Sequence, residues 1–156
     1  MYVIKVMSGE EKKVKYMLDK KGYKILCPSK IKLHRRKTAY FEKELVIFPG
    51  YIFLDTDYLS DKDYYDIKIC DGVIGFLSYK YAITDKEQKY IRFLDNNGKP
   101  IAALDIYFDQ TGKARIKDDY LSGLDEKIIS KNRKDKTVKL AFTVAGEERK
   151  IVLSYR

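Results

Sequence analysis

The chain of 156 residues carries 32 Lys and Arg against 23 Asp and Glu, which leaves a formal net charge of +9. Hydrophobic residues form 45% of the sequence and charged residues 35%, a balance typical of globular proteins and not of disordered or fibrous ones. No apolar run approaches the roughly 18 to 20 residues of a membrane span, and the N-terminus lacks signal-peptide features. We therefore expect a cytoplasmic, monomeric protein without a membrane partner, built as one medium domain or two small ones.

The surplus of positive charge favours an anionic partner, with nucleic acid ahead of a membrane surface, although basic globular proteins without such a partner are common. Cys27 and Cys70 lie far apart without a CxxC pair, which argues against a zinc site or a disulfide framework. The single histidine, His34, has no acid or nucleophile beside it, and Gly72 and Gly75 lack the spacing of a phosphate-binding loop. We expect no cofactor, no metal and no enzymatic activity.

The first 95 residues alternate strand-like and helix-like segments. A Ser or Thr stands three residues before an acid at Ser8, Ser60 and Thr84, and apolar residues at helical spacing follow each of these start signals. Gly22 is placed to end the first helix. Runs rich in β-branched and aromatic residues predict strands at 1–7, 25–27, 31–33, 45–48, 51–54 and 73–77. This alternation indicates an antiparallel sheet flanked by helices.

The cluster of Asp, Asn, Gly and Pro at 95–100 breaks both helix and strand and predicts a domain boundary. We expect a first domain over residues 1–95, a linker over 96–107 and a second domain over 108–156. Short strands are predicted at 114–116, 127–129 and 151–155, and strict alternation over Val138–Val144 marks a half-buried strand. A piece of about 50 residues built this way suits a small five-stranded β-barrel, which makes the fold class α+β.

Two segments concentrate positive charge. The segment Lys30–Lys37 (KIKLHRRK) holds five cations in eight residues without an acid, and residues 127–139 hold six cations and the single acid Asp135 across a turn between strands. A phosphate-contacting surface and a solvated hairpin or turn both explain such segments. The candidates for nucleic-acid contact are Arg35, Arg36, Lys37, Arg115, Lys127, Lys131, Arg133, Lys134, Lys136, Lys139, Arg149 and Lys150.

Three motifs resemble the NusG family of transcription elongation factors. YVIKVMSGEEKKVKYML is similar to that family's opening strand and first helix, FPGYIF to its signature turn and strand, and DGVIGFL to its later GV-GF-L segment. The C-terminal segment resembles an SH3-like KOW β-barrel, with Asp119 and Tyr120 where the family usually has Gly-Pro. Among the specialised paralogues the sequence resembles LoaP, an antiterminator type that binds an RNA hairpin, more than RfaH.

The resemblance implies a factor that binds the clamp region of RNA polymerase through an NGN-type N-terminal domain and suppresses pausing and termination. It assigns the polymerase contact to an aromatic-lined pocket, for which Tyr2, Phe48, Pro49, Tyr51 and Phe53 are the candidates by position. It further implies that the basic segments bind an RNA hairpin or, as a second option, non-template DNA. A general NusG-type elongation factor and a free-standing KOW protein that binds RNA or the ribosome stay open as alternatives.

Overall fold

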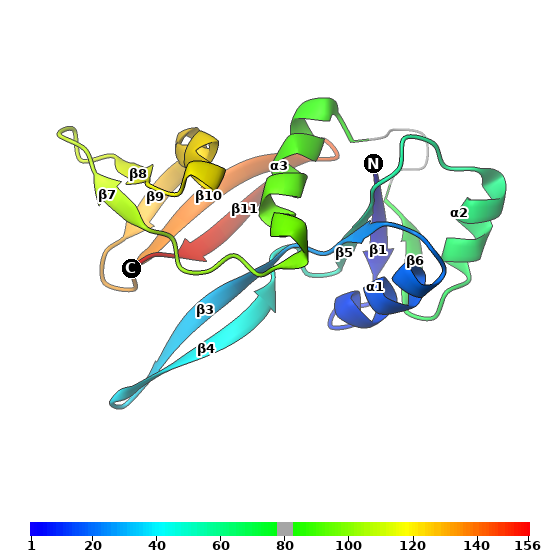
Figure 1. The fold of residues 1–156 in the computed structure, drawn as a ribbon, viewed down its shortest axis with the longest axis horizontal. Helices are drawn as coiled ribbons and strands as arrows, with labels where there is room; N and C mark the ends of the chain where they lie inside the picture. The colour runs from blue at the N-terminus through cyan, green and yellow to red at the C-terminus, as the bar shows by residue number, and fades with distance from the viewer. Residues whose placement is uncertain (78–82) are drawn as a thin grey trace.

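The computed structural model describes residues 1–77 and 83–156, with every side chain in those ranges except those of Arg35, Asp119, Tyr120 and Ser122. Four strands form the N-terminal sheet in the order β2-β5-β1-β6 (Figure 1). These strands span Tyr2–Val6 (β1), Ile25–Leu26 (β2), Tyr51–Leu54 (β5) and Val73–Phe76 (β6). All neighbouring strands pair antiparallel, which confirms the predicted sheet.

Helices cover both faces of this sheet. Helices α1 (Glu11–Lys20) and α2 (Asp61–Lys68) pack on the face that carries Ile52, and α3 (Asp85–Asp95) packs on the face that carries Phe53. Successive residues of a strand point to opposite faces, so the sequence YIFL of β5 supplies apolar side chains to both layers. The side chains of Ile52 and Phe53 are both fully buried, one in each layer.

Two of the three predicted helix start signals are confirmed. The Ser60 hydroxyl accepts a hydrogen bond from the backbone N–H of Asp63 at 3.1 Å at the start of α2. Thr84 and Glu87 form a reciprocal capping box at the start of α3, where each side chain accepts from the other residue's backbone N–H at 3.3 Å. These caps fix where both helices begin.

The prediction that Ser8 caps the first helix is wrong. Helix α1 begins after Glu10, and no side chain caps it. The Glu11 carboxylate accepts the backbone N–H of Gly9 at 3.2 Å, so the helix's own first acid satisfies a donor of the preceding turn. The prediction that Gly22 ends this helix is confirmed, because α1 ends at Lys20. Gly22 has φ +94°, a left-handed conformation that favours glycine.

Strands β3 (Ser29–Arg36) and β4 (Ala39–Val46) form a two-stranded antiparallel ribbon that projects from the body of the molecule (Figure 1). We call it the β3–β4 ribbon. The strands predicted at 31–33 and 45–48 cover only parts of it, because the ribbon continues through charged residues to a tight turn at Lys37 and Thr38. Most of its outer half is exposed on both faces, so it lacks the hydrophobic alternation from which a strand is predicted.

Five strands fill the C-terminal part. They span Ile106–Phe108 (β7), Ala114–Ile116 (β8), Ile128–Asn132 (β9), Thr137–Val144 (β10) and Glu147–Ser154 (β11). The alternation predicted for Val138–Val144 is confirmed, with every second residue buried. The predicted closed barrel is not confirmed: in the described residues, β7 pairs only with β8, and β11, β10 and β9 form a separate sheet. A 3-10 helix, Asp119–Lys127, connects β8 to β9.

One hydrophobic core joins the N-terminal and C-terminal parts. Phe53 of the N-terminal sheet and Phe142 of β10 belong to the same buried cluster, with α3 between the two parts (Figure 1). The connecting segment after the short 3-10 turn Asn96–Gly98 is held on both sides, because Ile101 bridges to β3 and Leu104 bridges to the end of the chain. Among the described helices, none has both the length and the apolar character needed to cross a membrane.

Candidate functional site

Phe48, Pro49, Gly50 and Tyr51 form a tight turn that leads into β5, which we call the aromatic turn. The backbone N–H of Tyr51 donates to the Phe48 carbonyl at 3.0 Å, and Gly50 has φ +85°, which a side chain would strain. The Glu11 carboxylate accepts the N–H of Gly50 at 2.7 Å. This bond fixes the aromatic turn to the start of α1.

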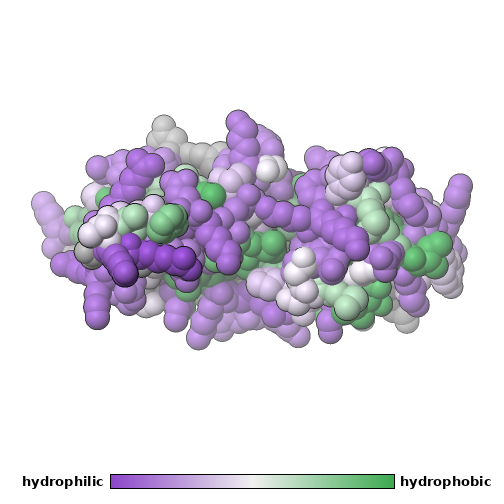
Figure 2. All heavy atoms as spheres, turned by 90° about the horizontal axis from the view of Figure 1, so that it is seen from below, coloured by the Kyte–Doolittle hydropathy of each residue, from purple (hydrophilic) through white to green (hydrophobic). Residues whose placement is uncertain are grey.

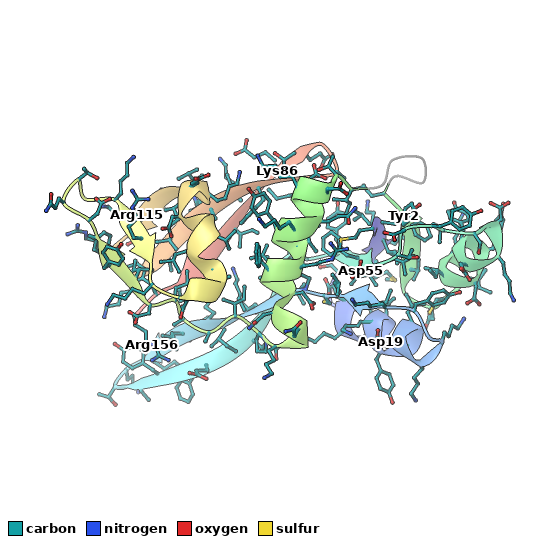
Figure 3. All side chains as sticks on the ribbon, turned by 45° about the horizontal axis from the view of Figure 1, so that its top comes forward. Tyr2, Asp19, Asp55, Lys86, Arg115 and Arg156 are labelled. Atoms are coloured by element: carbon teal, nitrogen blue, oxygen red, sulfur yellow. The ribbon has the colours of Figure 1, made fainter. Side chains whose placement is uncertain are left out.

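The five candidates for polymerase contact do not share one surface. The rings of Phe48 and Phe53 meet edge to face, with centroids 5.3 Å apart, and Tyr51 packs against the same core. Pro49 is exposed beside them. Tyr2 pairs with Leu54 across β1 and β5 and packs on the opposite face, with α1 and α2. Figure 3 shows Tyr2 in the N-terminal part, away from the C-terminal strands.

The C-terminal sheet covers the aromatic turn. The Arg149 guanidinium of β11 lies 4.9 Å from the centre of the Tyr51 ring. A surface cavity of about 420 Å³ beside this contact is lined by Ile47, Phe48, Pro49 and Tyr51 and by residues 148–151 of β11. Phe48 is only 5% exposed in this arrangement. Most of the Phe48 side chain is therefore shielded from a macromolecular partner in this arrangement.

Helix α3 makes a second contact with the C-terminal sheet. The rings of Tyr90 and Phe142 lie 5.4 Å apart, and the Lys127 ammonium sits 4.9 Å from the centre of the Tyr90 ring. The backbone N–H of Ala145 donates to the Glu87 carboxylate at 3.4 Å. These polar and aromatic contacts lie beside the hydrophobic core that α3 shares with the C-terminal sheet.

The turn between β9 and β10 gathers four exposed cations, which we call the basic turn: Lys131, Arg133, Lys134 and Lys136. Lys131 and Arg133 both stand 4.7 Å from the centre of the Phe108 ring. Asp135, the only acid nearby in sequence, is engaged with Asn132, whose amide donates to its carboxylate at 2.8 Å. Within the described part of the chain, none of the four cations forms an ion pair, so their charge is available to an anion.

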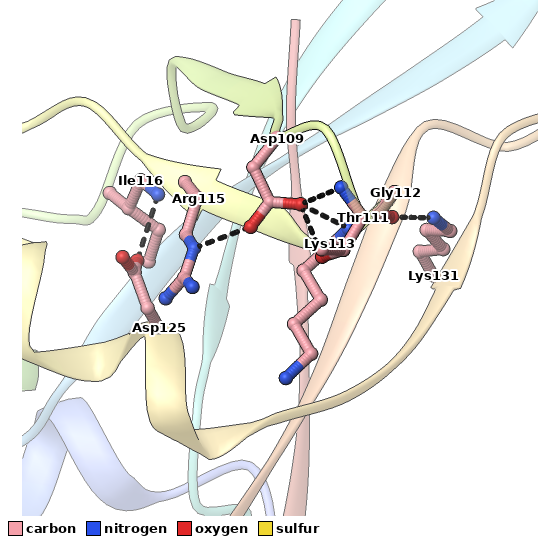
Figure 4. A network of polar contacts seen from close by, with 8 residues as sticks. All are labelled: Asp109, Thr111, Gly112, Lys113, Arg115, Ile116, Asp125 and Lys131. Carbon is pink, nitrogen blue, oxygen red and sulfur yellow. Dashed lines mark hydrogen bonds and ion pairs between the residues drawn. The ribbon is translucent and has the colours of Figure 1, made fainter.

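A polar network behind the basic turn orders the β7–β8 hairpin (Figure 4). The Asp109 carboxylate accepts from the Thr111 hydroxyl at 2.6 Å, the Lys113 N–H at 3.0 Å and the Arg115 guanidinium at 3.1 Å. The Lys131 ammonium donates to the Gly112 carbonyl, which ties this hairpin to β9. Arg115, a predicted nucleic-acid contact, is therefore neutralised by Asp109.

The remaining predicted cations divide into three places. Lys127 and Arg149 lie over the aromatic rings of the N-terminal part, as described above. Lys139 and Lys150 are exposed on the outer face of the C-terminal sheet. Arg36 and Lys37 stand exposed at the tip of the β3–β4 ribbon, and the side chain of Arg35 lies outside the described residues. The exposed candidates thus lie in three places: the basic turn, the ribbon tip and the outer face of the C-terminal sheet.

Cys27 and His34 carry side chains of the kinds that act as nucleophile and base in enzymes. Burial raises the pKa of the Cys27 thiol to about 11, so this thiol is protonated at neutral pH. His34 pairs with Phe41 on the β3–β4 ribbon, without a carboxylate on its own face of the ribbon. In residues 1–77 and 83–156, no three His, Cys, Asp or Glu side chains gather in a way that could hold a metal ion.

A family model described as transcription termination factor NusG matches residues 1–101. The chain belongs to the NusG family. The match covers the whole N-terminal sheet, α3 and the aromatic turn, which are the parts that carry the motifs FPGYIF and DGVIGFL. No curated protein matches the chain. NusG-family proteins are non-enzymatic transcription elongation and termination factors that interact with RNA polymerase.

Sequence reasoning missed two residues that shape these surfaces. Glu11 holds the aromatic turn of this NusG-family chain from 39 residues away, and no local pattern reports such a contact. Asp109 could have been found, because Asp-x-Thr-Gly is a typical Asx-turn sequence in which the carboxylate accepts backbone N–H groups two residues on.

Proposed function

We propose that this protein is a processive antitermination factor that binds RNA polymerase through the aromatic turn and a nascent RNA hairpin through the basic turn. It acts as a monomer of two units, an NGN-type domain over 1–95 and a KOW-type domain over 108–156, joined by a linker over 96–107. In this respect it resembles the LoaP group of NusG-family paralogues. The observation that carries the RNA step is the basic turn itself, four exposed cations on a projecting loop.

The electrostatics of the basic turn favour a phosphate backbone. In the described residues Asp135 forms no ion pair with Arg133, Lys134 or Lys136, and its single negative charge leaves the basic turn with a positive surplus. Each phosphate that such a cation neutralises releases a counterion, which favours binding at low salt. Duplex RNA hides its base edges in a deep groove, so the sequence is read from loop or bulge bases, and the cations hold the flanking phosphates.

The polymerase step requires the C-terminal sheet to leave the aromatic turn. Phe48 and Phe53 are buried, and Tyr51 is covered by Arg149, so these rings become a docking surface only after separation. A factor that binds only the closed-clamp form of polymerase shifts the polymerase toward that form by its differential affinity. The clamp then stays closed through pause and termination sites.

The RNA step is tested by measuring the affinity for an RNA hairpin at a series of salt concentrations. The probes are hairpins identified by sequencing RNA that is crosslinked to the protein in its own cells. The variant changes Arg133, Lys134 and Lys136 to Ala, and a matched control changes the exposed Lys62, Lys86 and Lys99 to Ala, which removes the same charge elsewhere. We expect the first variant to bind more weakly and to lower the salt slope by up to about three units, one for each lost phosphate contact. Equal slopes for both variants would contradict the RNA step.

A further inference from the structure

The register of the β3–β4 ribbon sorts its charges onto two different faces. Directly paired residues of an antiparallel ribbon share a face. The pairs Lys32 with Lys43 and His34 with Phe41 lie on one face, and Lys30, Arg36, Ala39 and Leu45 complete it. Both acids of the ribbon, Glu42 and Glu44, pair with Leu33 and Ile31 and so lie on the other face. We call the first surface the cationic face.

The charges of the cationic face are not compensated within the protein. Lys32 and Lys43 stand opposite each other, and like charges in directly paired positions destabilise a ribbon. Within the described residues, Lys32, Arg36 and Lys43 have no acidic partner. Glu44 is engaged elsewhere, because its carboxylate binds Lys12 of α1 and accepts the Ser29 hydroxyl at 2.8 Å. This arrangement is unfavourable until an anion lies across the face.

An exposed aromatic ring stands in the middle of these cations. Phe41 is 52% exposed and pairs with His34, and cations flank that pair on both sides along the ribbon. Cations in a row with rings between them are the elements of single-strand recognition, in which the cations hold phosphates and bases stack on the rings. Figure 2 views the molecule from the side to which the ribbon projects and shows a mainly hydrophilic surface with separate apolar patches.

The two faces of the ribbon point to different parts of the molecule. At the base of the cationic face, the Lys30 ammonium donates to the Val152 carbonyl of β11. At the base of the opposite face, Glu44 contacts α1. The cationic face is therefore turned toward the C-terminal sheet, which also carries the basic turn.

We propose that the cationic face of the β3–β4 ribbon binds a single-stranded RNA segment that flanks the hairpin held by the basic turn. This inference rests on the proposed function for the choice of RNA, because the RNA at the basic turn is what brings a flanking strand within reach of the ribbon. Lys32, Arg36 and Lys43 hold its phosphates, and Phe41 stacks on a base. Duplex RNA fits less well, since its bases are already stacked on one another and cannot reach the Phe41 ring.

The experiment separates the ribbon from the basic turn with three RNA probes: a hairpin without flanks, the same hairpin with a tail of uridines, and the uridine strand alone. The ribbon variant changes Lys32, Arg36 and Lys43 to Gln. A second variant, Phe41→Thr, tests stacking, and its matched control is Tyr40→Thr, because Tyr40 is 68% exposed on the opposite face. All are surface changes, and circular dichroism checks that each protein is folded.

We expect the tail to tighten binding of the hairpin to the wild type, because linked contacts add through a raised effective concentration. The ribbon variant should lose this gain, lower affinity for the uridine strand by about tenfold at low salt, and bind the unflanked hairpin as the wild type does. Phe41→Thr should weaken uridine binding severalfold, and Tyr40→Thr should leave it unchanged.

Three results would overturn the inference: a tail that adds nothing to the wild type, a tail whose gain survives in the ribbon variant, or a thymidine strand that binds the ribbon at least about tenfold tighter than uridine. The last result would assign the cationic face to unpaired DNA. Failure of the proposed function has a different signature. In that case Ala substitutions in the basic turn leave the affinity for the unflanked hairpin unchanged, whether or not the uridine strand binds the ribbon.

Discussion

The carboxylate of Glu11 accepts a hydrogen bond from the backbone N–H of Gly50 at 2.7 Å, and so joins the first residue of α1 to the aromatic turn. The same carboxylate oxygen also accepts the N–H of Gly9. Glu11 is 4% exposed and Gly50 is half-buried, so the bond to Gly50 is partly shielded from water, whereas Gly9 is exposed. The conformation of the surface that we propose for polymerase contact therefore depends on a side chain of the first helix.

Replacing Glu11 by Ala should destabilise the fold. The N–H groups of Gly9 and Gly50 would lose their acceptor. Water can replace it at the exposed Gly9, so the expected loss comes from the half-buried Gly50 donor and is about 1 kcal/mol in the free energy of unfolding, the low end of the cost of an unsatisfied buried donor. Glu11→Gln keeps an oxygen acceptor and should lose much less. Urea unfolding of the three proteins measures this difference, and equal losses for Ala and Gln would assign the effect to packing or charge instead.

Replacing Arg149 by Ala should strengthen polymerase binding. The guanidinium over the Tyr51 ring helps to hold the C-terminal sheet on the aromatic turn, and a half-exposed contact of this kind contributes about 0.5 to 1 kcal/mol. Without that contact, the form in which the C-terminal sheet lies on the aromatic turn is less stable. The apparent affinity for polymerase should therefore rise up to about fivefold. Lys139→Ala is the matched control, because Lys139 is exposed on the outer face of the sheet and does not line the cavity beside the aromatic turn. An affinity that responds equally to both changes would argue against the covering role of Arg149.

Replacing Asp109 by Asn should destabilise the C-terminal part at neutral pH but much less in acid. The Thr111 hydroxyl, the Lys113 N–H and the Arg115 guanidinium hold the pKa of Asp109 well below its ordinary value of 3.8, against an opposing effect of burial. A carboxyl whose pKa is lowered by folding stabilises the fold fully above its ordinary pKa. This stabilisation is lost gradually as the pH falls from 3.8 through the lowered pKa of the folded protein. Urea unfolding at about pH 7 and about pH 2 tests this. A loss that is the same at both pH values would mean that the charge of Asp109 does not contribute.

The buried parts of the fold could be predicted from the sequence, because burial leaves a periodic pattern. Strand β5 at Tyr51–Leu54 and strand β8 at Ala114–Ile116 are predicted at their observed bounds, and the alternation over Val138–Val144 matches the burial of β10. The caps at Ser60 and Thr84 are local hydrogen bonds between residues three apart, which a sequence shows directly. The long β3–β4 ribbon leaves no such pattern, since solvent surrounds its outer half.

The composition of the candidate surfaces could be predicted only in part. Charge runs identified the basic turn and the ribbon tip, but the sequence does not show which cations are already paired, as Arg115 is with Asp109. Nor does it show that Tyr2 lies on the opposite sheet face from Phe53, because that depends on the register between β1 and β5. The covering of the aromatic turn by β11 depends on packing between segments about 100 residues apart, which no local signal reports.

The most direct test of the central claim is the affinity of this protein for a reconstituted RNA polymerase elongation complex, measured for the wild type, Tyr51→Ala and Tyr65→Ala. Tyr65 is 61% exposed on α2, so its loss removes a ring of the same size from another surface. The account predicts that the wild type and Tyr65→Ala bind equally well, and that Tyr51→Ala loses roughly 2 kcal/mol or more, about thirtyfold in affinity. A folded Tyr51→Ala protein that binds polymerase with wild-type affinity, or a wild type that does not bind, would contradict it.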